Sequence, residues 1–466
     1  MEKIHFIGIG GSGLSAIARL VLEMGYAVSG SDRAESPFLT DLRTLGADIK
    51  IGHHPENIAG ANQVVRSSAI GDDNPEVVSA IKAGIPVLKR ADFLGKLMAG
   101  KNGIAVAGTH GKTTTTAMIA WVLTTLKQDP SFIIGGVMNN LGVNARAGKG
   151  DSFVIEADEY DRMFLGLRPK IEVITNVEHD HPDCYPTPQD FYSAFEKFVD
   201  LVPADGTIIA CEQDEGAKRL ISYAINEHKN VAAYAIDENA DQKSNIEVQT
   251  IASDLTSNKK GGFSFEAKVK DQSCQVDLQV PGRHNVLNGL ACLTTIAMLR
   301  LPIDKAARSL GEFQGTNRRF EIRGELEGMT FIDDYAHHPT EIRATLAAAR
   351  ARFSSNRIWV VWQPHTYSRT QLLQSEFSYA FADADQVIVT EVYAAREAKQ
   401  NYSAQRVVET MAHRAVKFIP QLEDASNYLI SHMKTGDVLL VLSAGNADLI
   451  NTWVMEYFTK NEVRHV

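Results

Sequence analysis

A glycine-rich loop that could bind phosphate lies between an apolar run and a predicted helix. The apolar run spans residues 103–107, and the loop after it consists of Gly108, Thr109, His110, Gly111, Lys112, Thr113 and Thr114. Glycines let successive backbone N–H groups converge on phosphate oxygens, Lys112 supplies a charge for the β- and γ-phosphates, and the Thr113 hydroxyl can reach magnesium. A chance match in a turn is the alternative, but the strand–loop–helix context favours a phosphate-binding loop.

Acidic and histidine residues end two further apolar strands downstream of this loop, at residues 156–161 (EADEYD) and 176–181 (NVEHDH). Open α/β sheets place ligands at the carboxyl ends of their strands, and carboxylate and imidazole groups there can hold magnesium. EADEYD alone could equally be a solvated acidic turn. His179 and His181 alternate along an extended segment, so they should point to opposite sides. We expect His181 to be the ligand and His179 to be structural.

A second glycine-rich segment, residues 8–13 (GIGGSG), also lies between a predicted strand and a predicted helix. Asp32 closes the next strand at about the spacing of a Rossmann dinucleotide site. The same geometry binds any diphosphate at a helix N-terminus, so this motif does not separate NAD or FAD from a UDP-sugar. It predicts a diphosphate-containing ligand and leaves the identity of that ligand open.

Apolar runs alternate with helical patterns along most of the chain, which predicts an α/β protein with three domains. Residues 1–100 form a Rossmann-like N-terminal domain in this interpretation. Residues 101–316 form a central P-loop ATPase-like domain with a parallel sheet and a small antiparallel patch, which we place within residues 246–281. Residues 317–466 form a C-terminal Rossmann-like α/β domain. The joints are short, so any domain closure must be absorbed by a few residues.

The composition limits the classes of partner. The chain has 466 residues, a formal net charge of -10, 44% hydrophobic and 22% charged residues, and four cysteines without a CxxC pair. These values indicate a folded protein with reduced thiols, and argue against a nucleic-acid partner. The first strand-like run is too short for a signal sequence and no apolar stretch reaches membrane-spanning length. We expect a cytoplasmic monomer or homodimer without a membrane partner.

Together the motifs resemble those of the Mur ligases of peptidoglycan synthesis, and the resemblance covers essentially the whole chain. It rests on residues 8–18, 29–32, 108–116, 156–165, 175–183, 281–288, 316–321, 333–341 and 363–370. The resemblance implies that ATP, with Mg2+ or Mn2+, converts the carboxylate of UDP-N-acetylmuramate into an acyl phosphate. The amine of L-alanine then attacks it, releasing ADP and phosphate. It also implies that the first domain binds UDP rather than NAD, the second ATP and the third the amino acid.

The resemblance further assigns roles to individual residues. The UDP-sugar contacts it implies are Gly10, Gly11, Ser12, Gly13, Asp32, Ser67 and Ser68. The metal ligands it implies are Thr113, Glu156 and His181. For ATP, beyond the phosphate loop, it implies Asn285 and Asn288 at the adenine, Arg319 at the phosphates and Asp334 at the ribose. The implied amino-acid contacts are Arg369, Tyr335 and His337, and the implied catalytic set is Lys112, Glu156, His181, Arg319 and His338.

Some of these roles also follow from residue chemistry. Arg369 could clamp a carboxylate through its planar fork, and one of the tandem histidines, for which we take His338, could accept the ammonium proton. Tandem histidines at a helix start are as often packing residues. Asn285 could instead cap a helix, and Arg319 could form a surface ion pair.

Three positions depart from the family pattern. Thr366 replaces an arginine, and Asn446 replaces an aspartate. The position of a lysine that several sibling ligases carbamylate corresponds to Phe195, with Lys197 displaced, so we expect no such modification. The alternatives for function are a ligase that adds a murein tripeptide to the same acid, an NAD-dependent oxidoreductase, and a non-catalytic ATP-regulated binding protein. The segment 363–370 favours alanine addition.

Overall fold

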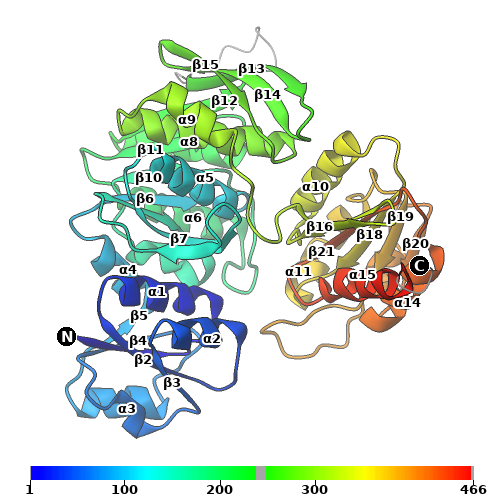
Figure 1. Cartoon of the computed structure of the whole chain (residues 1–466). Coiled ribbons are helices and arrows are strands. Elements are labelled where there is room, and N and C mark those ends of the chain that lie inside the picture. Colours follow the sequence, from blue (N-terminus) through cyan, green and yellow to red (C-terminus); the bar gives the residue numbers. More distant parts are fainter. Residues whose placement is uncertain (1, 238–247, 463–466) are drawn as a thin grey trace.

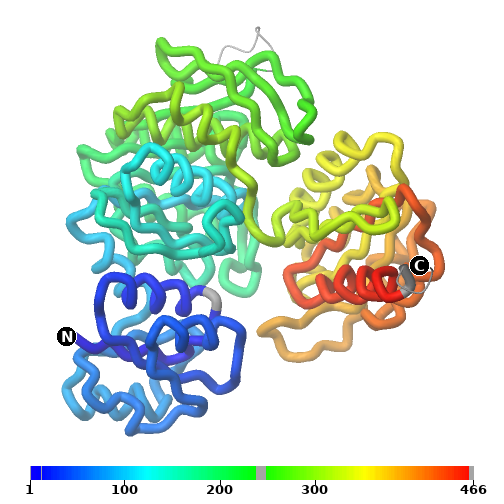
Figure 2. Tube along the Cα trace, in the orientation of Figure 1, coloured from blue at the N-terminus to red at the C-terminus, as the bar shows by residue number. Residues whose placement is uncertain are grey.

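The structure, a computed structural model, describes residues 2–237 and 248–462, and these form three α/β bodies (Figure 1). The first body lies below the middle one in this view, and the third lies beside them. The chain crosses to the third body after α9 (Ile303–Leu310), as the continuous trace shows (Figure 2). The predicted α/β class with three domains is confirmed.

The first domain is a five-stranded parallel sheet in the order β3-β2-β1-β4-β5. Its strands are β1 (Lys3–Ile7), β2 (Ala27–Asp32), β3 (Asp48–Ile51), β4 (Gln63–Arg66) and β5 (Val87–Lys89). Its helices are α1 (Ser12–Glu23), α2 (Pro37–Thr44), the 3₁₀ helix η1 (Pro55–Ile58), α3 (Pro75–Lys82) and α4 (Arg90–Met98). The strand order reverses between β1 and β4, so a ligand crevice is expected where these two strands end.

The middle domain contains a ten-stranded sheet in the order β15-β14-β13-β12-β11-β10-β6-β9-β7-β8. Its strands are β6 (Asn102–Ala107), β7 (Ser131–Met138), β8 (Val143–Arg146), β9 (Ser152–Glu156), β10 (Ile171–Ile174), β11 (Thr207–Cys211), β12 (Asn230–Ile236), β13 (Val248–Ser257), β14 (Phe263–Val269) and β15 (Gln272–Asp277). Its helices are α5 (Lys112–Thr125), η2 (Tyr160–Gly166), α6 (Pro188–Val199), α7 (Glu215–Asn226), α8 (Arg283–Met298) and α9.

The predicted antiparallel patch corresponds to β13–β15 and is continuous with the main sheet. β13 pairs in parallel with β12 and antiparallel with β14, so one strand joins the two parts. Residues 246 and 247 of the predicted patch lie outside the described residues.

The third domain is a six-stranded sheet in the order β16-β17-β21-β18-β19-β20, with the edge strand β16 antiparallel. Its strands are β16 (Glu321–Leu326), β17 (Met329–Asp334), β18 (Ile358–Gln363), β19 (Gln386–Val389), β20 (Val416–Phe418) and β21 (Val438–Ser443). Its helices are α10 (Pro339–Arg352), α11 (Tyr367–Leu372), α12 (Gln374–Ser378), α13 (Gln405–Val408), α14 (Leu422–His432) and α15 (Leu449–Glu462).

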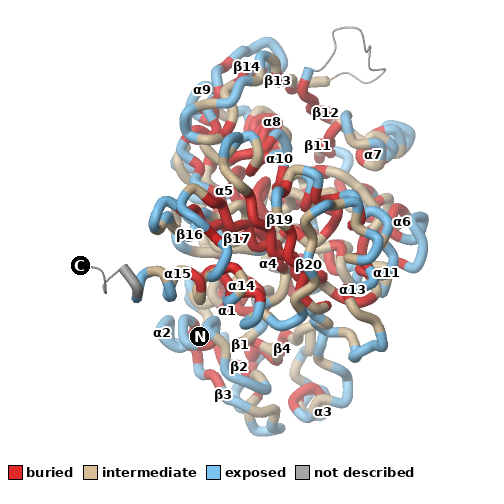
Figure 3. Tube along the Cα trace, turned by 90° about the vertical axis from the view of Figure 1, so that its right-hand side faces the viewer, coloured by how far each residue is buried: buried red, intermediate tan, exposed pale blue. Residues whose placement is uncertain are grey.

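The two domain joints differ in their packing. One apolar cluster runs through the first and middle domains and includes Phe6 and Ile17 as well as Val106 and Phe153. α1 packs on β7 and β8 across this joint. The third domain has its own apolar clusters on the two faces of its sheet, and buried segments are concentrated inside each body (Figure 3). The first two domains therefore share a core, whereas the third is held by other contacts. No helix among the described residues is both long and apolar enough to cross a membrane.

Two buried glutamates, Glu76 and Glu172, differ in their hydrogen-bond partners and therefore in the direction of their pKa shifts. Glu76, on α3, accepts hydrogen bonds from Ser31 Oγ at 2.6 Å and Asn57 Nδ2 at 2.6 Å and lies 3.2 Å from His5 Nε2. Burial alone would raise its pKa, but these partners lower the pKa of Glu76 to about 2. Glu172, in the middle of β10, is equally buried, and neither of its oxygens has a partner among the described residues. Burial raises the pKa of Glu172 well above its ordinary value.

We predict that one substitution, glutamate to methionine, has opposite effects at these two positions. Glu172→Met removes an unpartnered polar group and should raise the free energy of unfolding by about 1–3 kcal/mol at neutral pH. Glu76→Met removes a hydrogen-bond partner from Ser31, Asn57, His5 and the backbone N–H of His54, and should lower the free energy of unfolding by a similar amount.

The pH dependence gives the sign of the Glu172 effect. Its folded-state pKa is raised above the ordinary 4.5, so the wild type loses stability relative to Glu172→Met as pH rises above 4.5. Thermal unfolding followed by calorimetry between pH 4 and pH 8 measures both effects. A destabilised Glu172→Met variant at pH 8 would show that the carboxyl group has a partner.

Candidate active site

The predicted phosphate loop connects β6 to α5, and its glycines are required by its geometry. Gly108 has φ +134°, and a Cβ there would lie 2.1 Å from Thr175 Oγ1 at the end of β10. Gly111, with φ +82°, immediately precedes α5, and a Cβ on it would lie 2.8 Å from Asn288 Oδ1. The loop therefore packs against the end of β10 on one side and against α8 on the other.

Lys112 is folded back onto the loop. Its Nζ donates to Gly108 O at 2.6 Å, to Thr109 O at 3.0 Å and to Glu159 Oε1 at 2.8 Å. Burial alone would lower the pKa of Lys112, but Glu159 raises it, so the ammonium is charged. All three of its protons are used in this conformation, and the side chain must release some of these acceptors to reach a phosphate.

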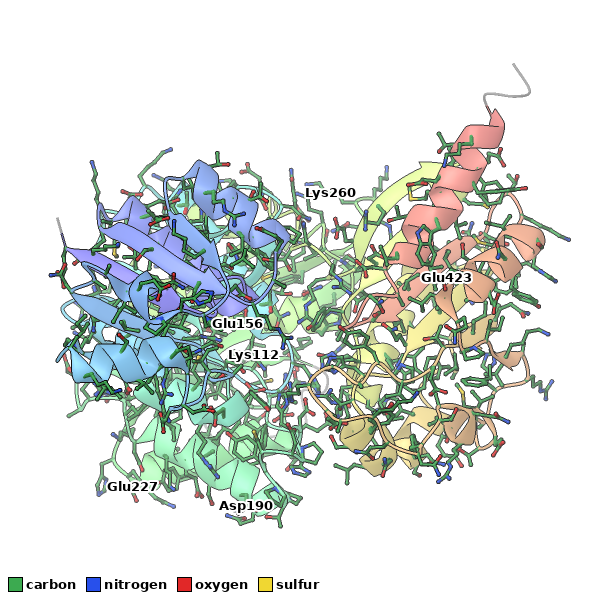
Figure 4. The ribbon with its side chains drawn as sticks, turned by 90° about the horizontal axis from the view of Figure 1, so that it is seen from below. Lys112, Glu156, Asp190, Glu227, Lys260 and Glu423 are labelled. Atoms are coloured by element: carbon green, nitrogen blue, oxygen red, sulfur yellow. The ribbon has the colours of Figure 1, made fainter. Side chains whose placement is uncertain are left out.

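Glu156 and Thr113 form the best-defined oxygen pair in the site. Thr113 Oγ1 donates to Glu156 Oε1 at 3.0 Å, and Gly135 N donates to Glu156 Oε2 at 2.6 Å. Lys112 and Glu156 lie close together on the side of the middle domain that faces the third (Figure 4). Burial raises the pKa of Glu156 despite the nearby ammonium. A hydroxyl beside a carboxylate is a donor set that suits Mg2+.

His181 lies on the other side of Lys112, not directly beside Glu156. Its Nε2 is 3.4 Å from Glu159 Oε1, so Glu159 lies between the lysine and the histidine. His179 Nε2 instead contacts Tyr185 O at 2.8 Å. The two histidines have different partners, as expected, but the reason differs, because the extended conformation stops at His181, where φ is +54°.

A cavity of 310 Å³ opens between the middle and third domains next to the phosphate loop. The predicted ATP residues that line it are His110, Gly111, Thr113, Thr114, Asn285, Asn288, Arg319 and Asp334. Gly108, Thr109 and Lys112 are not among its lining residues; the Thr109 hydroxyl donates to Glu178 O at 2.7 Å. Asn288 Nδ2 donates to Asn285 Oδ1 at 2.9 Å, and Asn285 Nδ2 donates to Pro281 O at 2.6 Å. These two amides lie one turn apart on α8 and make that side of the cavity polar.

The third domain contributes Arg319 and Asp334 to the lining of this cavity. Asp334 accepts backbone hydrogen bonds from Phe320 and Ala336, both at 2.7 Å. Burial raises the pKa of Asp334 to about 6 although Arg319 opposes the shift. The guanidinium of Arg319 lies 5.0 Å from the centre of the Tyr335 ring. Arg319 is thus oriented toward the cavity by an aromatic face.

His110 joins the middle and third domains through two carboxylates. Its Nε2 is 3.0 Å from Glu178 Oε2, and its Nδ1 is 3.1 Å from Glu341 Oε1 on α10. Burial alone would lower the pKa of His110, but the two carboxylates raise it to about 9. His338 lies beside this pair, with 4.8 Å between the two imidazole ring centres. Burial lowers the pKa of His338 to about 4, so it is neutral at pH 7.

Ligand atoms of His110, Glu178 and His338 lie within 4.8 Å of one another, a spacing that could hold a metal ion. A charged imidazolium donates from both nitrogens, however, and has no lone pair for a metal. The ion pair accounts for this cluster at neutral pH.

Arg369 makes a two-pronged salt bridge to Asp180. Its Nε and Nη2 donate to the two Asp180 oxygens at 2.9 and 3.1 Å, and both side chains are buried. Arg369, on α11, belongs to the third domain and Asp180 to the loop after β10. Burial alone would raise the pKa of Asp180, but Arg369 holds it well below its usual range. The fork predicted to clamp an incoming carboxylate is therefore occupied by a carboxylate of the protein.

The other predicted amino-acid residues lie near this bridge. The His337 ring is 5.5 Å from the Tyr335 ring and 5.6 Å from the His365 ring. Burial lowers the pKa of His337 to about 4 and that of His365 to about 2, so both rings are neutral.

The first-domain glycine loop lies at the switch point between β1 and β4. Gly10 N donates to Asp32 Oδ2 at 2.8 Å, and a Cβ on Gly13 would lie 2.4 Å from Arg90 Nη1. Ser67 and Ser68 line a cavity of 530 Å³ at the joint with the middle domain. Gly10, Gly11 and Gly13 do not line this cavity, and the side chain of Ser12 lies outside what the structure describes.

The three positions that depart from the family pattern have local roles. Thr366 is buried with φ +66° and immediately precedes α11. Asn446 Oδ1 accepts from Gln363 Nε2 at 3.0 Å. Phe195 is buried against Phe164, with ring centres 5.3 Å apart, whereas Lys197 is exposed.

Four carboxylates at the site were not selected from the sequence. Three of them, Glu159, Glu178 and Asp180, belong to motifs that were recognised, but nothing in the spacing shows that they, and not their neighbours, make the contacts with Lys112, His110 and Arg369. Glu341 is the third residue of α10 and forms a capping box with His338. That pattern indicates a helix start and gives no sign of a contact with the phosphate loop.

The chain matches three domains of one family along most of its length. Residues 3–102 match the catalytic domain of the Mur ligase family, residues 106–296 the Mur ligase middle domain, and residues 318–445 the Mur ligase glutamate ligase domain. The UDP-N-acetylmuramate–L-alanine ligase of Trichlorobacter lovleyi is 42% identical over 96% of this chain and 96% of its own length. That of Clostridium acetobutylicum is 42% identical over 96% of this chain and 95% of its own length.

Solved structures show the same arrangement. The UDP-N-acetylmuramate-alanine ligase from Thermotoga maritima has a TM-score of 0.79 at 29% identity, covering 99% of this chain and 100% of that one. A murein peptide ligase from Psychrobacter arcticus has a TM-score of 0.72 at 24% identity, covering 98% of this chain and 99% of that one. The second similarity concerns the fold alone.

We predict that Arg369→Met separates the third domain from the middle one. Asp180 would remain buried without a counter-charge, and it can regain water only if the joint opens. Hydrogen exchange of residues 178–183 should become faster by at least about tenfold, the change for a loss of about 1.4 kcal/mol. The double variant Asp180→Asn/Arg369→Met should recover much of the protection, because neither charge remains. Unchanged exchange in Arg369→Met would contradict a role for the bridge in docking.

Proposed function

The chain belongs to the Mur ligase family, and on that premise we propose that it uses ATP to join L-alanine to UDP-N-acetylmuramate. In this proposal residues 1–100 bind the UDP-sugar, residues 101–316 bind ATP and residues 317–466 bind the amino acid. The substrates are nucleotides and an amino acid, so we place the protein in the cytoplasm, as a monomer or homodimer, with no nucleic-acid or membrane partner.

One observation carries the proposal: the phosphate loop, the loops after β9 and β10, and the third-domain residues Arg319 and Asp334 surround one region beside a cavity of 310 Å³. Relatives that are 42% identical over 96% of the chain, and are named as L-alanine ligases, support the choice of substrates. These residues come from the middle and third domains, whereas Ser67 and Ser68 of the first domain line a separate cavity at the joint with the middle domain.

The reaction begins with a carboxylate, which resists attack by an amine because its charge is delocalised. Phosphoryl transfer from ATP converts the carboxylate into a mixed anhydride, whose leaving group is phosphate. In this proposal the Lys112 ammonium, released from Glu159, offsets the charge of the transferring phosphoryl group. Asn285 and Asn288 orient the adenine, Asp334 the ribose, and Arg319 faces the phosphates.

Thr113, Glu156 and His181 are the residues we propose to hold Mg2+ or Mn2+. The Thr113 hydroxyl and the Glu156 carboxylate are hard oxygen donors in direct contact, as such ions prefer. His181 Nδ1 is buried without a hydrogen-bond partner among the described residues, so this nitrogen could bind an ion. The bound ion would neutralise phosphate charge.

The second half of the reaction needs a neutral amine. The buried Nε2 of His338 has no hydrogen-bond partner in the described part of the chain, so it is free to accept a proton. We propose that it takes the ammonium proton, while Tyr335, His337 and Arg369 line the amino-acid side of the site. Attack on the anhydride then gives the amide and inorganic phosphate. Water would destroy the same anhydride, so the third domain must exclude it.

In the first domain the proposed UDP-sugar contacts are Gly10, Gly11, Ser12, Gly13, Asp32, Ser67 and Ser68. Asp32 holds the glycine loop in place, because one of its carboxylate oxygens accepts from Gly10 N. The choice of UDP over NAD rests on the family to which the chain belongs.

The proposal predicts phosphate release that depends on all three substrates. We expect the largest kcat/KM with L-alanine, roughly 10- to 200-fold above glycine, since one methyl group contributes that much discrimination in a fitted pocket. The murein tripeptide should give no turnover. NAD should give no binding signal. Equal turnover with the tripeptide would favour the peptide-adding alternative.

Lys112→Ala tests the phosphate loop in the same assay. It should lower kcat by about 100-fold or more, as for loss of one donor to a developing charge. Lys170→Ala is the matched control, because Lys170 lies in the same domain but pairs with Asp205 at the surface. Full activity of Lys112→Ala would refute the assignment of the loop.

The metal site makes a separate prediction. Glu156→Gln keeps the shape of the side chain and removes its charge, so the magnesium concentration for half-maximal activity should rise by about 10- to 100-fold. Asp205→Asn removes an exposed carboxylate of the same domain and should leave that concentration unchanged. A titration of the rate of ADP release against magnesium measures both. An unaltered titration for Glu156→Gln would remove Glu156 from the ligand set.

A further inference from the structure

Glu341 occupies a position that its role in starting α10 does not explain. Its Oε1 contacts His110 Nδ1 at 3.1 Å and lies 3.9 Å from Arg319 Nη1. Its Oε2 accepts from His337 N at 3.0 Å and from the N-cap residue His338 N at 3.4 Å, and the second of these contacts completes the capping box. One oxygen thus serves the third domain itself, and the other reaches the phosphate loop of the middle domain.

A second contact crosses the joint at the same place. Glu178, the other carboxylate on His110, accepts from Thr340 Oγ1 at 3.0 Å. His110 and Glu178 from the middle domain therefore alternate with Thr340 and Glu341 from α10. All four residues line the cavity of 310 Å³ or its rim.

The rest of the joint makes these polar contacts important. Within residues 2–237 and 248–462, the third domain shares no apolar cluster with the middle one, so its docking depends on hydrogen bonds and ion pairs. At the other end of α10, Arg352 Nη1 donates to Lys260 O in the β13–β14 turn, at 3.4 Å. α10 is anchored at both ends, but only its first turn touches the phosphate loop.

We propose that Glu341 is a positioning residue that couples docking of the third domain to the conformation of the phosphate loop. The inference rests on the proposed function and adds that the third domain docks before the acyl phosphate forms. With the third domain docked, Glu341 fixes His110, and His110 is two residues from Lys112. With the third domain away, the loop loses this anchor. The acyl phosphate then forms efficiently only when the amine-binding domain already shields it from water.

Glu341→Gln tests the proposal and preserves the helix, because glutamine at this position still completes a capping box. The decisive measurement is the ratio of ADP released to amide formed, at saturating ATP and UDP-N-acetylmuramate. We expect the ratio to be close to one in the wild type and at least about twofold higher in the variant, because the anhydride meets water. The KM for L-alanine should rise by about tenfold, as for loss of one charge-assisted hydrogen bond. The KM for UDP-N-acetylmuramate should stay within about twofold, since that ligand binds the first domain.

Arg352→Gln is the matched control on the same helix. It weakens a contact across the same joint but away from the loop, so its ratio of ADP to amide should equal that of the wild type. The ionisation of His110 gives an independent readout by NMR. Loss of one of its two carboxylate partners should lower its pKa from about 9. The charged or titratable groups around the ring are Glu178, Glu341, His338, His284 and Asp214.

The outcomes separate the two proposals. A wild-type chain that forms no amide would refute the proposed function, whatever the variants do. An active wild type with an unchanged ratio in Glu341→Gln would overturn the role of Glu341. If Glu341→Gln does not fold, Glu341→Asp replaces it; the shorter carboxylate keeps the charge but retracts from His110, and the ratio should rise by a smaller factor. An unchanged ratio in Glu341→Asp would then overturn the inference.

Discussion

The site depends on burying several carboxylates beside a loop built to receive a polyanion. The strand order places β6 between β10 and β9, so the phosphate loop after β6 is flanked by the acidic loops after its two neighbours. Glu156 ends β9 and Glu159 follows it, and Glu178 and Asp180 follow β10. Like charges this close repel strongly in a poorly hydrated environment. Each buried anion therefore needs a cation or a set of donors, and their arrangement fixes the geometry of the site.

The cations come from both sides of the domain joint. Lys112 neutralises Glu159 from within the middle domain, and Arg369 neutralises Asp180 from the third. His110 carries a proton because Glu178 and Glu341 face it from opposite domains. Buried ion pairs contribute little net stability but strongly disfavour any arrangement that leaves one partner alone. Ion pairs of this kind can therefore fix the position of the third domain on the middle one without a shared apolar cluster among the described residues. The joint between the first two domains differs, because it is apolar.

The sequence predicted much of the fold because parallel strands in α/β sheets are apolar throughout. The runs that correspond to β1, β6, β9 and β10 are recognised in this way. β7 was missed because Gly135 and Gly136 interrupt its apolar pattern, and β20 because three residues carry no periodicity. β16 is a polar edge strand, with none of its residues buried.

The motif loops were also recognised, because phosphate chemistry restricts their residue types. Which side chains contact each other was not predictable. Arg369 and Asp180 are 189 residues apart, and Glu341 and His110 are 231 apart, so only the packing of domains brings them together. The choice of Glu159 over Glu156 as the partner of Lys112 depends on the path of the chain after β9, which no spacing rule indicates.

The contacts of Lys112 give a reason for the buried Glu159. In this structure the ammonium has three protein acceptors, and Glu159 also lies next to His181. A triphosphate that draws Lys112 away would remove the ammonium from the buried Glu159 carboxylate, which is costly. A divalent cation that arrives with the nucleotide would restore the balance, since it brings two positive charges to the same region. Nucleotide and metal binding should therefore be strongly cooperative at this site, because each corrects the charge imbalance that the other creates.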